Sequence, residues 1–308
     1  MKNLISWVAL IVTTTLLINQ TVIAQCHIDD WTALKALYES TDGDNWKNRT
    51  GWDTQIANQT SSPANCDLSV LFGVLYGYGN FDRISEINLG NNNLDGTIPT
   101  QIGNLTNLKI LRLYSNELTG SIPSELAMLS NLEFMILDNN ELEGIIPLEL
   151  GNLYNLKELI LSSNELSGAI PKELGNLIKL EYLSITNNEL TGLIPPEMGG
   201  LSNLEVLRFR SNELEGEIPS ELGSLTKLKT LSLEDNNLQG SIPNAIGNLP
   251  NLADLYLHFN QLSGSIPSGF GDLENLKFLS LHNNQLSGSI PTELGKLFNL
   301  QDLMVSSN

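Results

Sequence analysis

The sequence has few residues of the kinds that usually carry catalysis or bind metals. Its 308 residues include three histidines and two cysteines. It has no Ser/His/Asp order of a hydrolase, no glycine-rich phosphate loop after a strand and no cysteine-rich metal spacing. Basic residues are also scarce, with 16 Lys and Arg against 35 Asp and Glu, and the net charge is −19. From the missing motifs we expect no enzyme, no cofactor and no metal site. Because nucleic-acid binding needs a basic surface, we also expect no nucleic-acid partner.

The sequence also lacks an apolar run long enough to make a good membrane span. A basic residue at position 2 precedes an apolar run from Leu4 to Ile18, and compact residues lead up to Ala24. The run is short and rich in threonine, which disfavours a span and is typical of a secretory signal peptide. We predict a signal peptide at residues 1–24, with an uncleaved anchor as the alternative, and a secreted or cell-surface location without a transmembrane segment in this chain.

What the sequence has in abundance is repetition, and a fixed period decides an architecture by itself. Steps of 24 residues from Ile84 reach a leucine every time up to Leu300, without insertion or deletion. Eight positions further on, the same steps run from Asn92 to Asn308 and meet asparagine every time. The chain therefore holds nine complete repeats and the first nine residues of a tenth.

Each part of the repeat LxxLxLxxNxLxGxIPxxLGxLxxL has its own physical role. In the unit at 180–203, Leu183 and Ile185 alternate with polar residues, as in a short strand with one buried face. Asn188 can bond the backbone groups of the following turn. Gly192 permits backbone angles closed to other residues, and Pro195 fixes the next bend. One coil cannot bury its leucines alone, so neighbouring coils must stack around a shared core.

These residues resemble a known family, the plant-type leucine-rich repeats, whose mark is the Leu-x-Gly-x-Ile-Pro motif present here as LTGSIP, LSGAIP and LEGEIP. The resemblance covers residues 84–308. It implies an α/β repeat solenoid: a curved right-handed coil with a concave parallel β-sheet and short helical turns on the convex side. Relatives of this type act as receptor ectodomains and as inhibitors of pectin-degrading enzymes.

Residues 25–83 are predicted to form an N-terminal capping domain for the solenoid. The segment DDWTALKALYEST begins with carboxylates suited to a helix N-cap and places apolar residues from Trp31 to Tyr38 on one helical face. Trp46 and Trp52 follow and can cover the first coil. Cys26 and Cys66 are an even pair in an exported chain, which predicts a disulfide. The segment is similar to the caps of bacterial and protist members more than to the plant version, which usually carries further cysteines.

The outward positions of the strands vary while the scaffold repeats, as expected for a recognition surface. Arginines and aromatic residues, the types enriched at binding hot spots, gather there in clusters. The candidate ligand-binding residues of this concave face are Arg112, Tyr114, Tyr182, Arg208, Arg210, Tyr256, His258, Phe259 and His282.

The sequence therefore favours a secreted or cell-surface binding module that recognises an extracellular protein, peptide or glycan through its strand face. Two alternatives stay open. One is a structural scaffold or adhesin of the cell envelope with no specific ligand. The other is adsorption to polysaccharide or ice through the regular convex side.

Four narrower predictions concern acidic residues, two histidines and the last coil. Asp42 and Asp44 are expected in a turn more than in a calcium loop, and the glutamate rows that recur with the period are expected to be a solvated edge more than a cation ladder. Glu234, His258 and His282 share the seventh repeat position, which allows a weak zinc or copper hypothesis. Because the tenth repeat stops before its Leu-x-Gly-x-Ile-Pro motif, we expect the natural chain to continue, with Leu300, Leu303 and Val305 on an exposed end. The alternative is that the partial coil is itself the cap.

Overall fold

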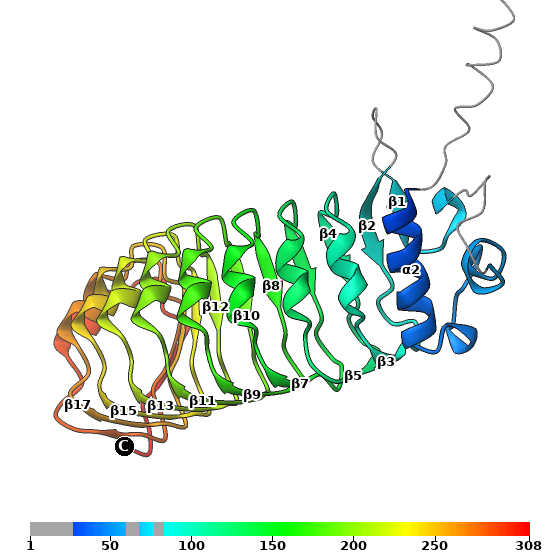
Figure 1. Ribbon diagram of the computed structural model, residues 1–308. Helices are drawn as coiled ribbons and strands as arrows, with labels where there is room; N and C mark the ends of the chain where they lie inside the picture. Colours follow the sequence, from blue (N-terminus) through cyan, green and yellow to red (C-terminus); the bar gives the residue numbers. More distant parts are fainter. Residues whose placement is uncertain (1–26, 60–67, 77–82) are drawn as a thin grey trace, which may run out of the picture.

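The computed structural model describes residues 27–59, 68–76 and 83–308. Figure 1 shows coils stacked side by side in a curved row, with helix α2 (Ile28–Ser40) at one end and the C-terminus at the other. Each complete coil contributes a three- to five-residue strand to one sheet and a five-residue 3-10 helix to the opposite side. The expected repeat solenoid, with a parallel sheet, short helical turns and a helical cap, is confirmed.

The main sheet follows the strands predicted at the start of each repeat. Its strand order is the order of the sequence, and only β1 pairs antiparallel with its neighbour β2. Leu183 lies opposite Leu159 on one side and Leu207 on the other, so identical repeat positions form columns across the coils. The strands are β1 (Val74–Tyr76), β2 (Ile84–Asn88), β4 (Ile110–Arg112), β6 (Phe134–Ile136), β8 (Glu158–Ile160), β10 (Tyr182–Ser184), β12 (Val206–Arg208), β14 (Thr230–Ser232), β16 (Asp254–Tyr256), β18 (Phe278–Ser280) and β20 (Asp302–Met304).

A second row of strands begins just after the asparagine of each repeat. The sequence analysis did not predict this row. In β11 the side chain of Leu190 is buried between exposed Glu189 and Thr191, the alternation of a strand with one covered face. Gly192 ends the straight part with φ 75°, a conformation open to glycine. The strands are β3 (Asp95–Thr97), β5 (Glu117–Thr119), β7 (Glu143–Ile145), β9 (Glu165–Ala169), β11 (Glu189–Leu193), β13 (Glu213–Glu217), β15 (Asn237–Ser241), β17 (Gln261–Gly264) and β19 (Gln285–Leu286).

Short 3-10 helices form the convex side, each directly after the proline of its repeat. The glycine at the fourth position of most of them is required by close packing: a Cβ on Gly175 would lie 2.5 Å from the carbonyl oxygen of Glu197 in the next coil. The helices are η4 (Thr100–Asn104), η5 (Ser124–Met128), η6 (Leu148–Asn152), η7 (Lys172–Asn176), η8 (Pro196–Gly200), η9 (Ser220–Ser224), η10 (Asn244–Asn248), η11 (Ser268–Asp272) and η12 (Thr292–Lys296).

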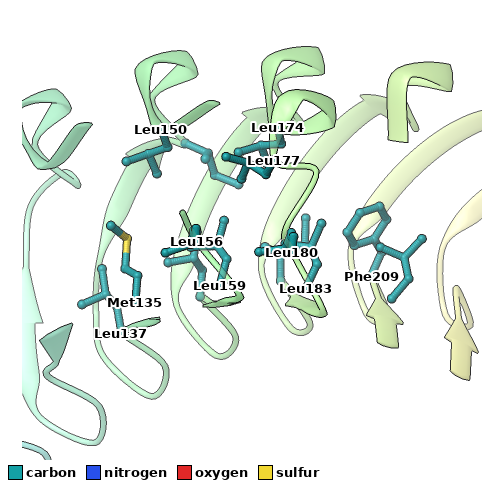
Figure 2. Close-up of a cluster of buried hydrophobic side chains, with 14 of the residues drawn as sticks. Met135, Leu137, Leu150, Leu156, Leu159, Leu174, Leu177, Leu180, Leu183 and Phe209 are labelled. Atoms are coloured by element: carbon teal, nitrogen blue, oxygen red, sulfur yellow. The ribbon is translucent and has the colours of Figure 1, made fainter. Parts of the chain in front are cut away.

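The core is one continuous stack of apolar side chains between the strands and the helical turns. Figure 2 shows Leu156 and Leu159 of one coil beside Leu180 of the next, and all three are fully buried. The repeat asparagine holds the turn that follows the strand. The side-chain carbonyl of Asn164 accepts the N–H of Leu142 at 3.1 Å, and its amide donates to the Leu137 and Leu161 carbonyls at 3.1 and 3.0 Å. The predicted role of Asn188 is confirmed by the same pattern.

The capping segment covers the first coil with α2 and a group of aromatic rings. The predicted helical face, including Trp31 and Tyr38, is buried. Trp46 and Trp52 are also buried, and their ring centroids lie 4.8 Å apart with Tyr38 packed against both. The other capping elements are η1 (Gly43–Asn45), η2 (Asp53–Ala57) and η3 (Leu68–Val70).

A buried ion pair joins the cap to the first strand of the solenoid. Asp30 is fully buried; one carboxylate oxygen lies 2.7 Å from the Arg83 guanidinium and the other accepts the N–H of Ile84 at 2.9 Å. The prediction that a carboxylate caps α2 is wrong, because His27 occupies the N-cap position and makes no capping hydrogen bond with its side chain. The carboxylate of Asp30 binds the repeats instead.

At the other end, β20 pairs with β18 on one side. Leu303 is exposed there, as expected, with 38% of its surface accessible. Leu300 and Val305 differ from the expectation, since both are partly buried against the core. Both side chains pack against the buried core, whereas Leu303 lies in β20, which has a neighbouring strand on one side only.

Candidate functional site

A groove of about 700 Å³ lies on the concave face over the middle coils. Its lining comes from the third, fifth and seventh positions of successive repeats. These positions alternate with the buried leucines, and in a strand alternate side chains share one face. The lining residues are Asp138, Ile160, Ser162, Tyr182, Ser184, Thr186, Arg208, Arg210, Thr230, Ser232, Glu234, Asp254, Tyr256 and His258.

The depth of the groove comes from a contrast of side-chain sizes along the sheet. Ser184, Thr230 and Ser232 are short and buried in its floor. Larger side chains, from Tyr182 on one strand and Tyr256 on another, line it beside them. A surface that would otherwise be a shallow curve is therefore hollowed across several neighbouring coils.

Two arginines present their guanidinium groups to this groove. Arg208 donates a hydrogen bond of 2.8 Å to the hydroxyl of Tyr182, and its guanidinium lies 5.6 Å from the centre of that ring. The Nε of Arg210 lies 3.7 Å from a carboxylate oxygen of Glu234, and 58% of the Arg210 side chain is accessible. Each guanidinium has five N–H donors in a planar fork, so both keep donors for a ligand.

The acidic groups of the groove are set deeper than the arginines. Glu234 is 6% exposed and accepts a hydrogen bond of 2.7 Å from the Ser232 hydroxyl. Burial raises the pKa of this carboxyl, and burial likewise raises the pKa of Asp138. Asp254 also lines the groove; it is half-buried and accepts a hydrogen bond of 2.9 Å from the Thr230 hydroxyl. The most exposed charged side chains of the lining are those of Arg208 and Arg210.

A cluster of aromatic rings borders the groove on its C-terminal side; we call His258, Phe259 and His282 the aromatic cluster. The rings of His258 and His282 stack with centroids 4.5 Å apart and an interplanar angle of 17°. Phe259 meets His282 nearly edge-on at 5.2 Å and 75°. Burial, with the neighbouring His282 and Arg210, lowers the pKa of His258 to about 4. The ring of His258 is therefore neutral at neutral pH.

Phe259 occupies an unfavourable backbone conformation. Its φ is 53°, in the left-handed region, where a bulky side chain is an outlier. This conformation costs roughly 1–2 kcal/mol for ordinary residues and less for asparagine and aspartate. The same position in the other repeats, the partial tenth included, holds Asn91, Ser115, Asn139, Ser163, Asn187, Ser211, Asp235, Asn283 and Ser307.

The structure brings most of the predicted site residues together but separates two of them. Tyr182, Arg208, Arg210, Tyr256 and His258 line the groove, and Phe259 and His282 adjoin it.

Arg112 and Tyr114 lie outside the groove, near the N-terminal end of the sheet. Arg112 is 3.0 Å from the Glu86 carboxylate and packs on the ring of Phe134. The ring of Tyr114 lies over Gly90, where an added Cβ would be 2.4 Å from it. Both side chains are thus held by neighbours in their own part of the sheet.

Sequence reasoning missed the small and acidic part of the lining. Asp138, Ile160 and Ser162 have no hot-spot character by residue type, and Ser184 and Ser232 matter because they are short. The available signal was positional: all five occupy the fifth or seventh column of the repeat. A run of short residues between large ones in those columns predicts a hollow.

The geometry of the seventh column does not form a metal centre. His258 and His282 stack face to face, whereas imidazole nitrogens that share a metal must direct their in-plane lone pairs to one point. Within the described ranges no group of three or more His, Cys, Asp or Glu side chains is arranged to hold a metal ion. Asp42 and Asp44 lie in a turn as expected; Asp42 accepts from Asn45 and Asp44 from Tyr38.

Two predictions concern residues outside the part of the chain that the structure describes. The predicted signal peptide at residues 1–24 lies there, as do Cys26 and Cys66 with their predicted disulfide. Among the residues that are described, no helix has the length and apolar character needed to cross a membrane.

Comparison with known proteins gives consistent family matches. A leucine-rich repeat region model matches residues 196–308, and a leucine-rich repeat model matches residues 82–142 and 154–214. A search among curated proteins finds no match.

Several solved structures are similar to this chain. The ectodomain of the receptor kinase GASSHO1/SCHENGEN3 from Arabidopsis thaliana, in complex with CASPARIAN STRIP INTEGRITY FACTOR 2, is 37% identical with a TM-score of 0.81. The Arabidopsis receptor kinase HAESA, in complex with the peptide hormone IDA and the co-receptor SERK1, is 32% identical with a TM-score of 0.75. Each alignment covers 88% of this chain, but only 32% and 44% of the respective receptor chain.

A plant ice-binding protein is similar over most of both chains. It is 29% identical with a TM-score of 0.64, and the alignment covers 87% of this chain and 90% of that one. The repeat period, the two rows of strands, the helical cap and these matches agree. The chain belongs to the leucine-rich repeat family, and its repeats are of the plant type.

Proposed function

We propose that this protein is an extracellular binding module whose groove takes an extended peptide segment of its ligand. The observation that carries the proposal is the groove itself, a hollow of about 700 Å³ lined by outward positions of successive repeats. Clefts of this volume suit ligands that place several side chains in contact with the protein.

The charges of the groove favour a ligand that carries a carboxylate. Arg208 and Arg210 are exposed in its centre, while Glu234 is buried beneath them. Arginine forks bind carboxylates through two parallel hydrogen bonds. A C-terminal carboxylate or an acidic side chain of the peptide would satisfy the donors that Tyr182 and Glu234 leave free.

The similar proteins support the same class of function. GASSHO1/SCHENGEN3 was solved in complex with CASPARIAN STRIP INTEGRITY FACTOR 2, and HAESA in complex with a peptide hormone and a co-receptor. This chain spans less than half of either ectodomain, so receptor signalling and co-receptor binding are not carried over with the fold. Export through a signal peptide at residues 1–24 would place the module outside the cell.

A random peptide library displayed on phage tests the proposal directly. The immobilised protein should select peptides that share an acidic group, and a synthetic selected peptide should bind in calorimetry. The double variant Arg208→Gln, Arg210→Gln should bind that peptide at least roughly tenfold more weakly, because arginines that a ligand covers at the centre of an interface are typical hot spots. Arg112→Gln is the matched control, since Arg112 occupies the fifth position of its repeat, as Arg208 does, but lies outside the groove. Equal affinity of the double variant and the wild type would refute the role of the groove.

Adsorption to ice is a second candidate, favoured by the similarity to the plant ice-binding protein over 90% of its chain. An ice recrystallisation assay with the wild type distinguishes the two functions. Inhibition of crystal growth that survives the double arginine variant would favour adsorption through another face. Absence of inhibition, together with peptide selection, favours the groove.

A further inference from the structure

We propose that the aromatic cluster of His258, Phe259 and His282 anchors an apolar side chain of the bound peptide. This inference rests on the proposed function and specifies what the C-terminal side of the groove recognises.

The first observation is that Phe259 is unfavourable for the fold. Its backbone is held in the left-handed region by the repeat: its N–H donates to the His282 carbonyl at 3.1 Å, and its carbonyl accepts the Asn236 N–H at 3.1 Å. Every other repeat, the partial tenth included, puts serine, asparagine or aspartate at this position. Burial does not compensate for the strain, because Phe259 is 52% exposed. Strained residues of this kind are concentrated at sites of function.

The second observation is that neighbouring rings fix the orientation of Phe259. It stands nearly perpendicular to His282 and lies 5.5 Å from His258, and about half of its own surface is exposed beside these rings. The Nδ1 of His282 pairs with the Ser280 hydroxyl at 2.9 Å, which sets the angle of that ring. Aromatic rings at such angles favour a third apolar or aromatic group packed against their faces and edges.

The third observation is that the cluster continues the groove. His258 lines the groove and contacts both other rings of the cluster. Arg210 belongs to the sixth repeat and His258 to the eighth, so they stand two strands apart, or roughly 10 Å at the usual strand spacing. An extended peptide covers that span in about three residues. The peptide should therefore carry its apolar side chain about three residues from its acidic group.

The test compares peptide selection and thermal stability for the wild type and Phe259→Asn. The probe is the same random phage library. Wild type should select peptides with an acidic group and an apolar residue at the spacing given above. Phe259→Asn should select the acidic group without the apolar residue, bind the wild-type peptide at least roughly tenfold more weakly, and melt at a higher temperature. Phe298→Asn is the control, because Phe298 is 94% exposed and lies on the convex side, where it should affect neither readout.

The outcomes separate this inference from the function on which it rests. If Phe259→Asn recovers the same apolar preference as the wild type, or melts at a lower temperature, the anchor is overturned. The arginine double variant then still tests whether the groove binds the peptide. If the wild-type protein selects no peptide, the proposed function fails and this inference fails with it.

Discussion

The capping segment and the repeats bury apolar surface by opposite means. The cap uses side chains that occur once, above all the packed rings of Tyr38, Trp46 and Trp52. The repeats use the same leucine columns in every coil. A repeat array is stabilised by the sum of similar units and their interfaces, whereas each ring of the cap has no equivalent elsewhere. The loss of one side chain should therefore matter differently in the two regions.

Polar contacts show the same difference. One buried ion pair, Asp30 with Arg83, joins the cap to the first strand. In the repeats an asparagine such as Asn164 makes the same set of hydrogen bonds as its counterparts one coil away on either side. The cap depends on single contacts, and the solenoid on the repetition of one contact.

The largest effect that would test this comparison is expected from Trp52→Ala. Trp52 is fully buried and its indole N–H donates to the Phe72 carbonyl at 3.1 Å. Its removal should lower the free energy of unfolding by about 3–5 kcal/mol, since large-to-small changes in cores leave a cavity. Urea unfolding followed by circular dichroism measures this. Phe298→Ala on the exposed convex side is the control. A Trp52→Ala loss as small as the control's would mean that the cap is not a unique core.

An intermediate and more local effect is expected from Asn164→Ala in the repeats. The substitution leaves the buried N–H of Leu142 without its acceptor, which costs about 1–3 kcal/mol. Because neighbouring coils keep their own asparagines, the loss should stay within the adjacent turns. Hydrogen exchange should show faster exchange at Leu142 and unchanged protection in the cap. Glu165→Ala, at the exposed next position, should leave the Leu142 amide as protected as in the wild type. Uniform loss of protection would contradict the local picture.

The smallest effect is expected in the pH dependence of stability that His258 of the aromatic cluster causes. Burial holds the pKa of His258 at about 4, below its ordinary 6.5. The unfolded chain therefore binds more protons than the folded one between these pH values. The contribution of neutral His258 to the free energy of unfolding is thus present above pH 6.5 and is lost as the pH falls toward 4. Between pH 7.5 and 5.5 the loss should be about 1 kcal/mol. Melting curves should show a smaller decrease for His258→Asn than for the wild type. Equal decreases would mean that His258 is not responsible.

Sequence periodicity was enough to predict most of the fold, because each repeat states its own inward columns. The strand at Tyr182–Ser184, the turn asparagine and the stacked leucines all follow from alternation and spacing. The second row of strands, such as Glu189–Leu193, was not predicted, because the pattern there was interpreted only through Gly192 and the bend at Pro195. Its pairing depends on the neighbouring coil, which one repeat alone does not contain.

The site was predicted in part, for a different physical reason. Residue type identified Arg208, Arg210 and Tyr256, but it also selected Arg112, which is held by Glu86 away from the groove. Hollows depend on short residues beside long ones, and a search for large side chains overlooks Ser184 and Ser232. The strain at Phe259 was not visible either, because its position becomes left-handed only when the coil closes.

The constant register of the main sheet has a consequence for any extended chain that lies across it. Strands repeat every 4.7–4.9 Å, roughly, whereas an extended chain advances about 3.3 Å per residue. The two spacings coincide only at intervals: about three ligand residues span two coils, and residues between those points do not align with a coil. A ligand that alternates its side chains would meet equivalent repeat positions only at intervals of several coils. On a sheet whose columns held identical residues, most ligand side chains would therefore not align with the residues that bind them. The varied lining between Asp138 and His258 suits such a ligand better than a perfectly periodic surface.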